Sequence, residues 1–228
     1  MLYIVATPIG NLEDITLRAL RILREVDFIL CEDTRVTKRL LEKYEITTPS
    51  VSYHQHSSDA KINKIIDRLQ SGESAALVTD AGTPGISDPG NILIDAILRF
   101  PLIDNLRIVP IPGSSALTTA LSIAGASTDR FWFLGFLPHK KGKQTLFELI
   151  ANTKETVVFY ESNHRIRKTL ETLARYIGNR PVVVCRELTK MFETIYRGTI
   201  SEVLEELDER GEFVVIICGP LDKEIKQM

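Results

Sequence analysis

Short runs of apolar residues alternate with amphipathic segments of helix length along almost the whole chain. The runs are rich in aliphatic and β-branched residues without polar alternation, which is typical of parallel strands buried on both faces. Repeated strand–helix–strand order favours an open α/β sheet covered by helices on both sides. In the first half we expect strands at Leu2–Ala6, Phe28–Cys31, Ser50–Tyr53, Ala75–Thr79 and Arg107–Ile111, separated by helices at Leu12–Val26, Arg35–Tyr44, Ala60–Leu69 and Asn91–Phe100.

The pattern changes after the proline-rich segment Val109–Gly113. There, Glu193–Ile200 alternates apolar and polar residues and follows the preceding strand without a crossover helix, which indicates an antiparallel strand. We therefore predict two α/β domains, residues 1–113 and 114–228, the second with a mixed sheet. Its strands are expected near Arg130–Phe136, Thr156–Tyr160, Pro181–Cys185, Thr194–Thr199 and Glu212–Cys218, and its helices near Gln144–Ala151, Arg165–Ile177 and Ser201–Arg210.

The overall charge is close to neutral, since 28 Lys and Arg face 30 Asp and Glu. The chain therefore has no global field that attracts nucleic acid, and any RNA contact requires a local basic patch. Its cysteines (Cys31, Cys185 and Cys218) are widely spaced in apolar runs, which is typical of a reducing compartment. The N-terminus lacks a basic segment, and prolines interrupt the uncharged stretch Ile108–Thr128. We therefore expect a cytoplasmic protein without a signal peptide or a membrane span.

The densest chemical signal is the segment 78–90, which directly follows a predicted buried strand and precedes a helix. It contains Gly82, Gly85 and Gly90 together with two prolines and two aspartates. In open α/β sheets, ligands bind at the carboxyl ends of strands, where glycine lets the backbone approach them closely. A long turn capped by aspartates is the structural alternative. The spacing matches neither a dinucleotide fingerprint nor a P-loop.

Two further strand ends of the first half are rich in turn residues. The segment IPGSSA at 111–116 leads into a helix, and its serines fit either an N-cap or a contact to a ligand carboxylate or ribose. The first strand ends in Thr7-Pro-Ile-Gly-Asn11. Three strand-end loops of this half are therefore polar and suited to a ligand.

Six separated motifs resemble the tetrapyrrole-methylase fold family, and within it the bacterial RsmI-type methyltransferases of 16S rRNA. The motifs are ATPIGN at 6–11, CEDTR at 31–35, TDAGTPGISDPG at 79–90, IPGSSA at 111–116, GFLP at 135–138 and FYESNHR at 159–165. They cover nearly the whole chain in the expected order. After Gly219-Pro220 the chain soon ends, so we expect no additional C-terminal extension.

The resemblance implies two α/β domains with S-adenosylmethionine (SAM) in the cleft between them, and a homodimer. It also implies 2′-O-methylation of a cytidine in the decoding region of 16S rRNA, in the small ribosomal subunit, and no DNA partner. Gly82-Thr83-Pro84 matches the Gly-Asp-Pro loop of relatives with Thr in place of Asp, so we expect Asp80 to supply the carboxylate. The expected cofactor residues are Pro8, Asp80, Gly82, Thr83, Gly85, Ile86, Ser114, Ser115, Tyr160, Cys185, Arg186 and Pro220.

Methyl transfer to a ribose hydroxyl requires positioning, exclusion of water and a group that accepts the hydroxyl proton. Three strand ends offer candidates for that group: Asp33, His54 and Glu161. Each has a structural alternative. Asp33 can pair with Arg35 and cap the next helix, the histidines can lie on the surface, and Glu161 can cap a helix. The pair His54 and His56 lacks a third ligand, so we predict no metal site.

RNA binding requires basic surface, and three clusters provide it. One is a helix that carries Arg35, Lys38, Arg39 and Lys43; another is the loop with Lys140, Lys141 and Lys143; the third contains His164, Arg165, Arg167 and Lys168. The spacing of the first cluster places it near one side of the helix, where a solvated face explains it equally well. Together the clusters favour charge segregated to one surface.

Three alternative functions remain open from the sequence. The same fold can methylate a tetrapyrrole or a modified protein side chain, in which case an apolar cleft is expected. A metal-dependent hydrolase centred on the H-x-H pair requires a third ligand. A non-catalytic RNA-binding module predicts no affinity for SAM.

Overall fold

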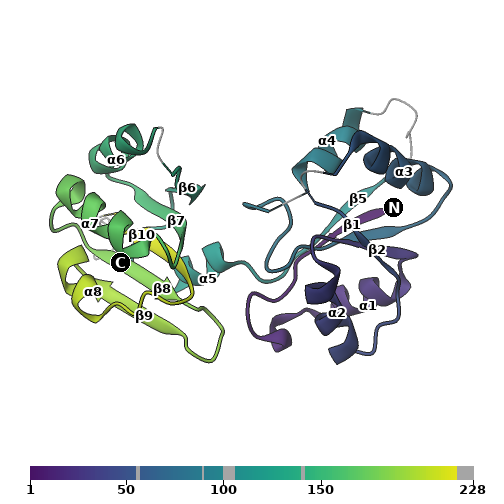
Figure 1. The fold of residues 1–228 in the computed structure, drawn as a ribbon, viewed down its shortest axis with the longest axis horizontal. Helices are drawn as coiled ribbons and strands as arrows, with labels where there is room; N and C mark the ends of the chain where they lie inside the picture. Colours follow the sequence, from purple (N-terminus) through teal and green to yellow (C-terminus); the bar gives the residue numbers. More distant parts are fainter. Residues whose placement is uncertain (55–56, 89, 100–105, 140–141, 220–228) are drawn as a thin grey trace, which may run out of the picture. The chain divides into compact units, whose positions relative to one another are not determined.

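The computed structural model describes residues 1–54, 57–88, 90–99, 106–139 and 142–219. They belong to two compact units, residues 1–115 and 116–228 (Figure 1). The sequence places the boundary at residue 113, and the division between the units follows Ser115. Each unit contains one sheet with helices packed against it.

The sheet of the first unit is parallel throughout its described part, with strand order β3-β2-β4-β1-β5. Its strands are β1 (Leu2–Val5), β2 (Phe28–Cys31), β3 (Ser50–Ser52), β4 (Ala75–Leu77) and β5 (Ile108–Ile111). The helical elements are η1 (Leu12–Asp14), α1 (Leu17–Glu25), α2 (Thr34–Lys43), α3 (Asp59–Gln70) and α4 (Asn91–Arg99). The prediction of an open α/β sheet is therefore confirmed.

Alternating side chains of this sheet feed two separate cores. Ile29 and Cys31 of β2 pack with residues of α1 and α2, whereas Phe28 and Leu30 pack with residues of α3 and α4. Successive strand residues point to opposite faces, so the uninterrupted apolar run of β2 buries one core on each side. The predicted helix cover on both faces is present.

The first expected helix is not continuous. The sequence predicts a helix over Leu12–Val26, but the chain forms the short 3₁₀ helix η1 and then α1. Thr16 causes the break, because its extended backbone and its hydroxyl, which accepts a hydrogen bond from the Ala19 N–H at 3.0 Å, make it the N-cap of α1.

The second unit has the mixed sheet that the sequence predicts, in the order β6-β7-β10-β8-β9. The pair β6–β7 is parallel, and the other described pairs are antiparallel. The strands are β6 (Phe131–Phe136), β7 (Thr156–Ser162), β8 (Val182–Arg186), β9 (Thr194–Gly198) and β10 (Glu212–Ile217). The helices are α5 (Ala116–Ser122), α6 (Lys143–Asn152), α7 (Ile166–Ile177) and α8 (Ile200–Glu206).

Helix α8 is shorter than predicted. It begins with a capping box, in which Thr199 and Glu202 satisfy each other's backbone N–H groups, but it ends at Glu206 rather than at Arg210. Leu207 is extended, and Asp208 turns instead toward Arg186 of β8. A tertiary ion pair therefore ends a helix that its local sequence would have continued.

The uncharged stretch Ile108–Thr128 forms β5, a loop and α5. Among the described helices, none has both the length and the apolar composition needed to cross a bilayer.

Candidate functional site

The loops after β1 and β4 are joined by a two-residue bridge. The N–H of Thr7 donates to the carbonyl oxygen of Gly82 at 2.9 Å, and the N–H of Gly82 donates back to Thr7 at 3.0 Å. The Thr7 hydroxyl also donates to the carbonyl oxygen of Thr79 at 3.0 Å. These bonds are buried, so the two strand-end loops are held as one structure.

The loop after β5 joins the same structure through side-chain hydroxyls. Thr83 donates to the carbonyl oxygen of Ser114 at 3.0 Å, and the Ser114 hydroxyl donates to the carbonyl oxygen of Asp14 at 2.9 Å. The carboxyl edge of the first sheet therefore gathers three loops. They carry the predicted cofactor residues of this unit: Pro8, Asp80, Gly82, Thr83, Gly85, Ile86, Ser114 and Ser115.

Two glycines of this edge lie in confined positions. Gly85 has φ +84°, and a Cβ there would lie 2.8 Å from Oδ1 of Asn91, whose amide donates to the Gly85 carbonyl oxygen at 3.1 Å. A Cβ on Gly113 would lie 3.0 Å from the Cβ of Ala6. Glycine is therefore favoured at both positions, because neighbouring side chains occupy the space that a Cβ would need.

Carboxylates gather beside these loops, at the ends of β2 and β4. Glu32, Asp33, His54 and Asp80 line an open pocket of about 510 Å³ together with Thr34, Arg35 and Ser52. Burial, followed by the nearby charges of Glu32 and Asp80, raises the pKa of Asp88 to about 6. Burial also raises the pKa of Glu32, followed by the charge of Asp80.

The raised pKa values of Glu32 and Asp88 were not predicted from the sequence. Strand order is the feature that indicates their proximity: Glu32 follows β2, and the loop that contains Asp88 follows β4, the neighbour of β2 in the sheet. Adjacent parallel strands bring their carboxyl ends together.

Asp33 is the cap of α2 and the ion-pair partner of Arg35. Its carboxylate accepts the backbone N–H of Arg35 at 2.8 Å and lies 2.6 Å from the guanidinium. The hydrogen bonds from Arg35 hold the pKa of Asp33 at about 2. Asp33 therefore caps α2 and pairs with Arg35, which is the structural alternative that the sequence offered for it. A carboxylate with this pKa is a weak proton acceptor at neutral pH.

His54 remains at the pocket edge, directly after β3. Its backbone N–H donates to the Ser57 hydroxyl at 3.1 Å, which shapes the turn. His56 lies outside the described residues. Within the described ranges no group of three or more His, Cys, Asp or Glu side chains could hold a metal ion.

Glu161 is enclosed in the second unit rather than exposed to a substrate. Its side chain has no exposed surface, and it pairs with Nε of Arg165 at 3.2 Å. It also accepts the Thr169 hydroxyl at 2.8 Å, and Nζ of Lys143 donates to that hydroxyl at 3.0 Å. Its carboxylate is therefore already paired within the second unit, which favours a structural role over the expected catalytic one.

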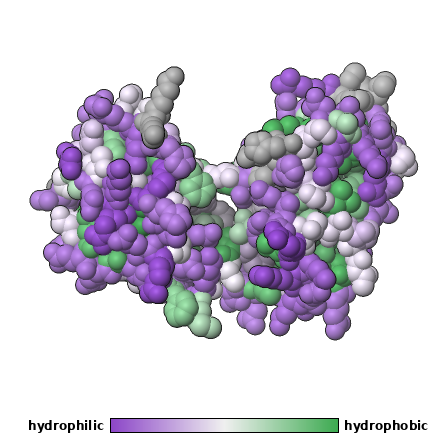
Figure 2. Space-filling model, viewed as in Figure 1, coloured by the Kyte–Doolittle hydropathy of each residue, from purple (hydrophilic) through white to green (hydrophobic). Residues whose placement is uncertain are grey.

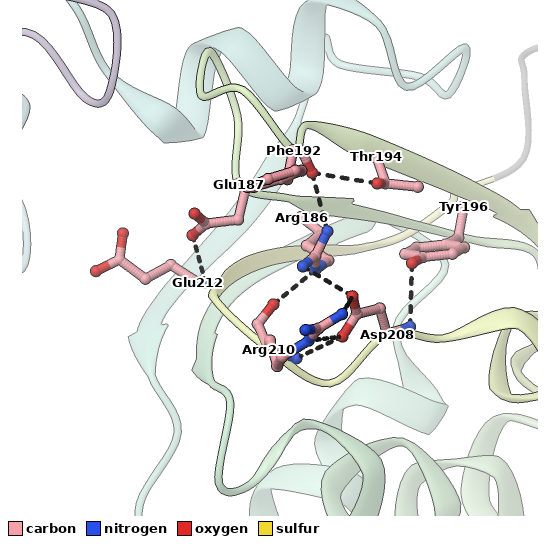
Figure 3. A network of polar contacts seen from close by, with 8 residues as sticks. All are labelled: Arg186, Glu187, Phe192, Thr194, Tyr196, Asp208, Arg210 and Glu212. Atoms are coloured by element: carbon pink, nitrogen blue, oxygen red, sulfur yellow. Dashed lines mark hydrogen bonds and ion pairs between the residues drawn. The ribbon is translucent and has the colours of Figure 1, made fainter.

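Arg186 and Cys185 are also inside the second unit. Figure 3 shows the Arg186 guanidinium at the centre of a polar network, where it donates to the carbonyl oxygens of Arg210 at 2.6 Å and Phe192 at 2.9 Å. It also pairs with Asp208 at 3.0 Å. Cys185 is fully buried, and burial raises the pKa of its thiol to about 11. The burial of both side chains and the contacts of Arg186 favour structural roles, and their expected cofactor contacts stay a prediction.

Tyr160 and Pro220 complete the predicted cofactor set. Tyr160 is partly buried in β7 and packs edge-on against Phe133 and Phe136, with ring centroids 5.1 and 5.6 Å apart. Pro220 lies outside the described residues.

The predicted basic clusters occupy different environments. On α2, Arg35 pairs with Asp33 and Lys38 pairs with Glu42 at 3.5 Å, so part of its charge is neutralised locally. Arg39 is exposed. Lys140 and Lys141 lie outside the described residues, while Lys143, His164 and Arg165 line one pocket. Hydrophilic side chains cover most of both units in the view of Figure 2, so hydropathy alone singles out no RNA surface.

The sheet topology and the glycine-rich carboxyl edge define a class of α/β enzyme, and comparison with known families identifies it. Residues 1–204 match the family model of the Tetrapyrrole (Corrin/Porphyrin) Methylases. The chain belongs to this family, which confirms the resemblance. The enzyme class, a methyltransferase, and its methyl donor, SAM, are confirmed with it.

Relatives with curated names are similar over almost the whole chain. The ribosomal RNA small subunit methyltransferase I of Halalkalibacterium halodurans is 46% identical over 226 residues, which are 97% of this chain and 77% of that protein. The protein of the same name from Bacillus subtilis is 46% identical over 231 residues, covering 100% of this chain and 78% of its own length.

Solved structures agree on the fold. A diphthine synthase matches with a TM-score of 0.75 and 14% identity, over 96% of this chain and 89% of that chain. A cobalt precorrin-4 methyltransferase matches with a TM-score of 0.69 and 20% identity, over 96% and 94% of the two chains. At these identities the likeness concerns the fold alone.

Proposed function

We propose that the protein transfers a methyl group from SAM to the ribose 2′-oxygen of a cytidine in the decoding region of 16S rRNA. The observation that carries this proposal is the 46% identity, over nearly the entire chain, to proteins named ribosomal RNA small subunit methyltransferase I. The basic pocket of the second unit supports an RNA substrate, because phosphate contacts need such local charge on a nearly neutral chain.

The three joined loops of the first unit fit SAM. They pack closely around Gly85 and Gly113, and they lie beside carboxylates suited to ribose hydroxyls and to a positively charged sulfur. We assign the cofactor contacts to the loops 79–88 and 112–115 and to Pro8. When bound, SAM supplies an electrophilic methyl group; the protein orients the acceptor and excludes water.

His54 is the best-placed proton acceptor for the ribose hydroxyl. Asp33 is held ionised by Arg35, and Glu161 is enclosed, whereas His54 lines the open pocket beside Glu32 and Asp80. We assign Asp80 to the cofactor rather than to proton transfer.

A small ribosomal subunit as the working substrate, a homodimer and a cytoplasmic location are part of the same proposal. One copy of a chain with net charge -2 offers limited basic surface, and two copies would extend the footprint on a large RNA. Sedimentation at working concentration should give the mass of two chains.

The acceptor class is tested by offering radiolabelled SAM with four substrates in parallel. These are small subunits that lack decoding-region ribose methylation, the free 16S rRNA from them, a precorrin tetrapyrrole, and a protein that carries the modified histidine intermediate of diphthamide. The proposal predicts label in the subunits or the free rRNA alone. Label in the tetrapyrrole or the protein, with none in RNA, would overturn it.

A further inference from the structure

A basic pocket lies between the first turns of α6 and α7, which neighbour each other in the second unit (Figure 1). Its volume is about 500 Å³. Lys143 comes from α6, Arg165 and Lys168 from the start of α7, and His139 and His164 from the adjoining loops. No acidic side chain lines it within the described part of the chain.

Both helices begin at this pocket without a side-chain cap. Gly142 precedes α6 in a left-handed conformation, and Arg165 precedes α7; neither makes a side-chain hydrogen bond to the first turn. An uncapped N-terminus presents backbone N–H groups and the positive end of the helix dipole. Two such termini facing one pocket add to the charge of its side chains.

Two cationic side chains of the pocket, Arg165 and Lys143, are held in place by buried polar groups. Enclosed Glu161 fixes Arg165 directly, and it fixes Lys143 through the Thr169 hydroxyl. Arg165 also donates to the carbonyl oxygen of Leu137 at 2.7 Å. Rigid placement lowers the entropic cost of binding a ligand.

The charge of this pocket exceeds what Glu161 can neutralise. Burial lowers the pKa of Lys143; the charge of Glu161 acts in the opposite direction, and the charges of Arg165 and Lys168 lower the pKa further. No described residue forms an ion pair with Lys168, which is exposed at the rim. An anion in the pocket would relieve this repulsion.

We propose that the pocket between α6 and α7 binds a backbone phosphate of the RNA substrate, an inference that rests on the proposed function. Its lining consists mainly of cationic and hydroxyl donors, with Gln144 as the one amide and two aromatic rings below. Such a lining recognises an anion rather than the edge of a base, so the contact positions the RNA without reading its sequence.

The test uses the full chain and a decoding-region fragment of 16S rRNA. Affinity is measured across a salt series for wild type, for Lys168→Gln and for Arg175→Gln, a matched loss of one exposed charge in the last turn of α7, outside the pocket lining. Lys168→Gln should weaken binding and flatten the slope of log affinity against log salt by about 0.7–0.9. Arg175→Gln should leave both unchanged, and SAM affinity should be the same in all three proteins.

A second variant guards against indirect effects. Gln144→Glu adds an acid at the pocket and near the N-terminus of α6, where a negative charge favours the helix itself. It should weaken RNA binding more than Lys168→Gln does; thermal unfolding is measured alongside, because the new carboxylate loses the hydrogen bond that Gln144 donates to Glu148 at 3.1 Å and repels that side chain.

The failures are distinguishable. A wild-type protein that neither binds nor methylates the RNA contradicts the proposed function. A wild type that does both, with Lys168→Gln and Gln144→Glu retaining its affinity and salt slope, overturns the pocket assignment alone. Titration with inorganic phosphate separates the sources: phosphate affinity lost in Lys168→Gln, with an unchanged RNA slope, would assign the pocket to a free anion and overturn the RNA contact.

Discussion

The hydroxyl of Thr83 donates a hydrogen bond to the carbonyl oxygen of Ser114, 3.0 Å away, and so ties the loop after β4 to the loop after β5. The resemblance matches Thr83 to the aspartate of a Gly-Asp-Pro loop. A carboxylate is an acceptor and cannot donate to a carbonyl oxygen, whereas a hydroxyl can. Threonine at this position therefore braces the candidate cofactor edge from within.

Thr83→Val removes that brace while keeping the shape of the side chain. A single lost hydrogen bond of this kind costs about 1 kcal/mol, so SAM affinity should fall about fivefold. Isothermal titration of SAM checks this, with Thr83→Ser as the control that keeps the hydroxyl. Equal SAM affinity in wild type and Thr83→Val would show that the brace does not shape the site.

Gly85→Ala and Gly72→Ala form a matched pair. Both glycines have left-handed backbones, with φ +84° and +99°, so alanine should cost each about 1 kcal/mol of folding stability. Only Gly85 lies in the candidate cofactor loop and has Asn91 in the way, whereas a Cβ on Gly72 meets no atom within 4 Å. SAM binding should be lost in Gly85→Ala alone; equal SAM affinity in both variants would contradict the loop assignment.

Asp88 should make stability depend on pH. Its pKa is about 6 in the folded protein against 3.8 for an aspartate in water, so the folded state binds more protons between these limits. The free energy of unfolding should therefore fall as pH rises from about 4 to 6 through this group. Denaturant unfolding of wild type and Asp88→Asn across this range checks it: the difference should grow with pH in favour of the variant, and parallel curves would contradict the raised pKa.

His54→Gln should separate proton transfer from binding. Loss of a general base typically costs about 10²–10⁴-fold in rate, with SAM and RNA affinities preserved. Asp33→Asn is the comparison, since Asp33 caps α2 and pairs with Arg35; it should lose stability but keep most of the turnover. Single-turnover rates that fall in Asp33→Asn but not in His54→Gln would identify Asp33 as the general base instead.

Arg186→Lys tests whether this residue is structural. Lysine lacks the guanidinium fork that satisfies the carbonyl oxygens of Arg210 and Phe192 (Figure 3), and each unsatisfied buried group costs about 1–3 kcal/mol. Thermal unfolding should shift down while SAM affinity stays at the wild-type value. A variant with wild-type stability and weakened SAM binding would show instead that Arg186 contacts the cofactor.

The local pattern of apolar residues predicts most of the fold, because a parallel strand buried on both faces consists of an uninterrupted apolar run. The expected and observed limits of β2 are both Phe28–Cys31. The candidate cofactor edge is likewise predicted by the concentration of glycine, proline and serine at three strand ends. The partners and roles of individual charged residues could not be predicted in this way. Asp33 bonds a neighbour in sequence, but its choice between capping and chemistry depends on side-chain geometry. Arg186 meets Asp208 only when β8 packs beside the segment that precedes β10, and Glu161 meets Thr169 only when α7 packs against β7.

Nucleoside analysis of the methylated RNA tests the central claim most directly. Small subunits lacking decoding-region ribose methylation are incubated with the protein and SAM, and the rRNA is digested to nucleosides and separated by mass spectrometry. The account predicts one new 2′-O-methylcytidine per 16S rRNA, absent when SAM is omitted. A methyl group on a base, on another nucleoside, or no methylation of the RNA at all would contradict it.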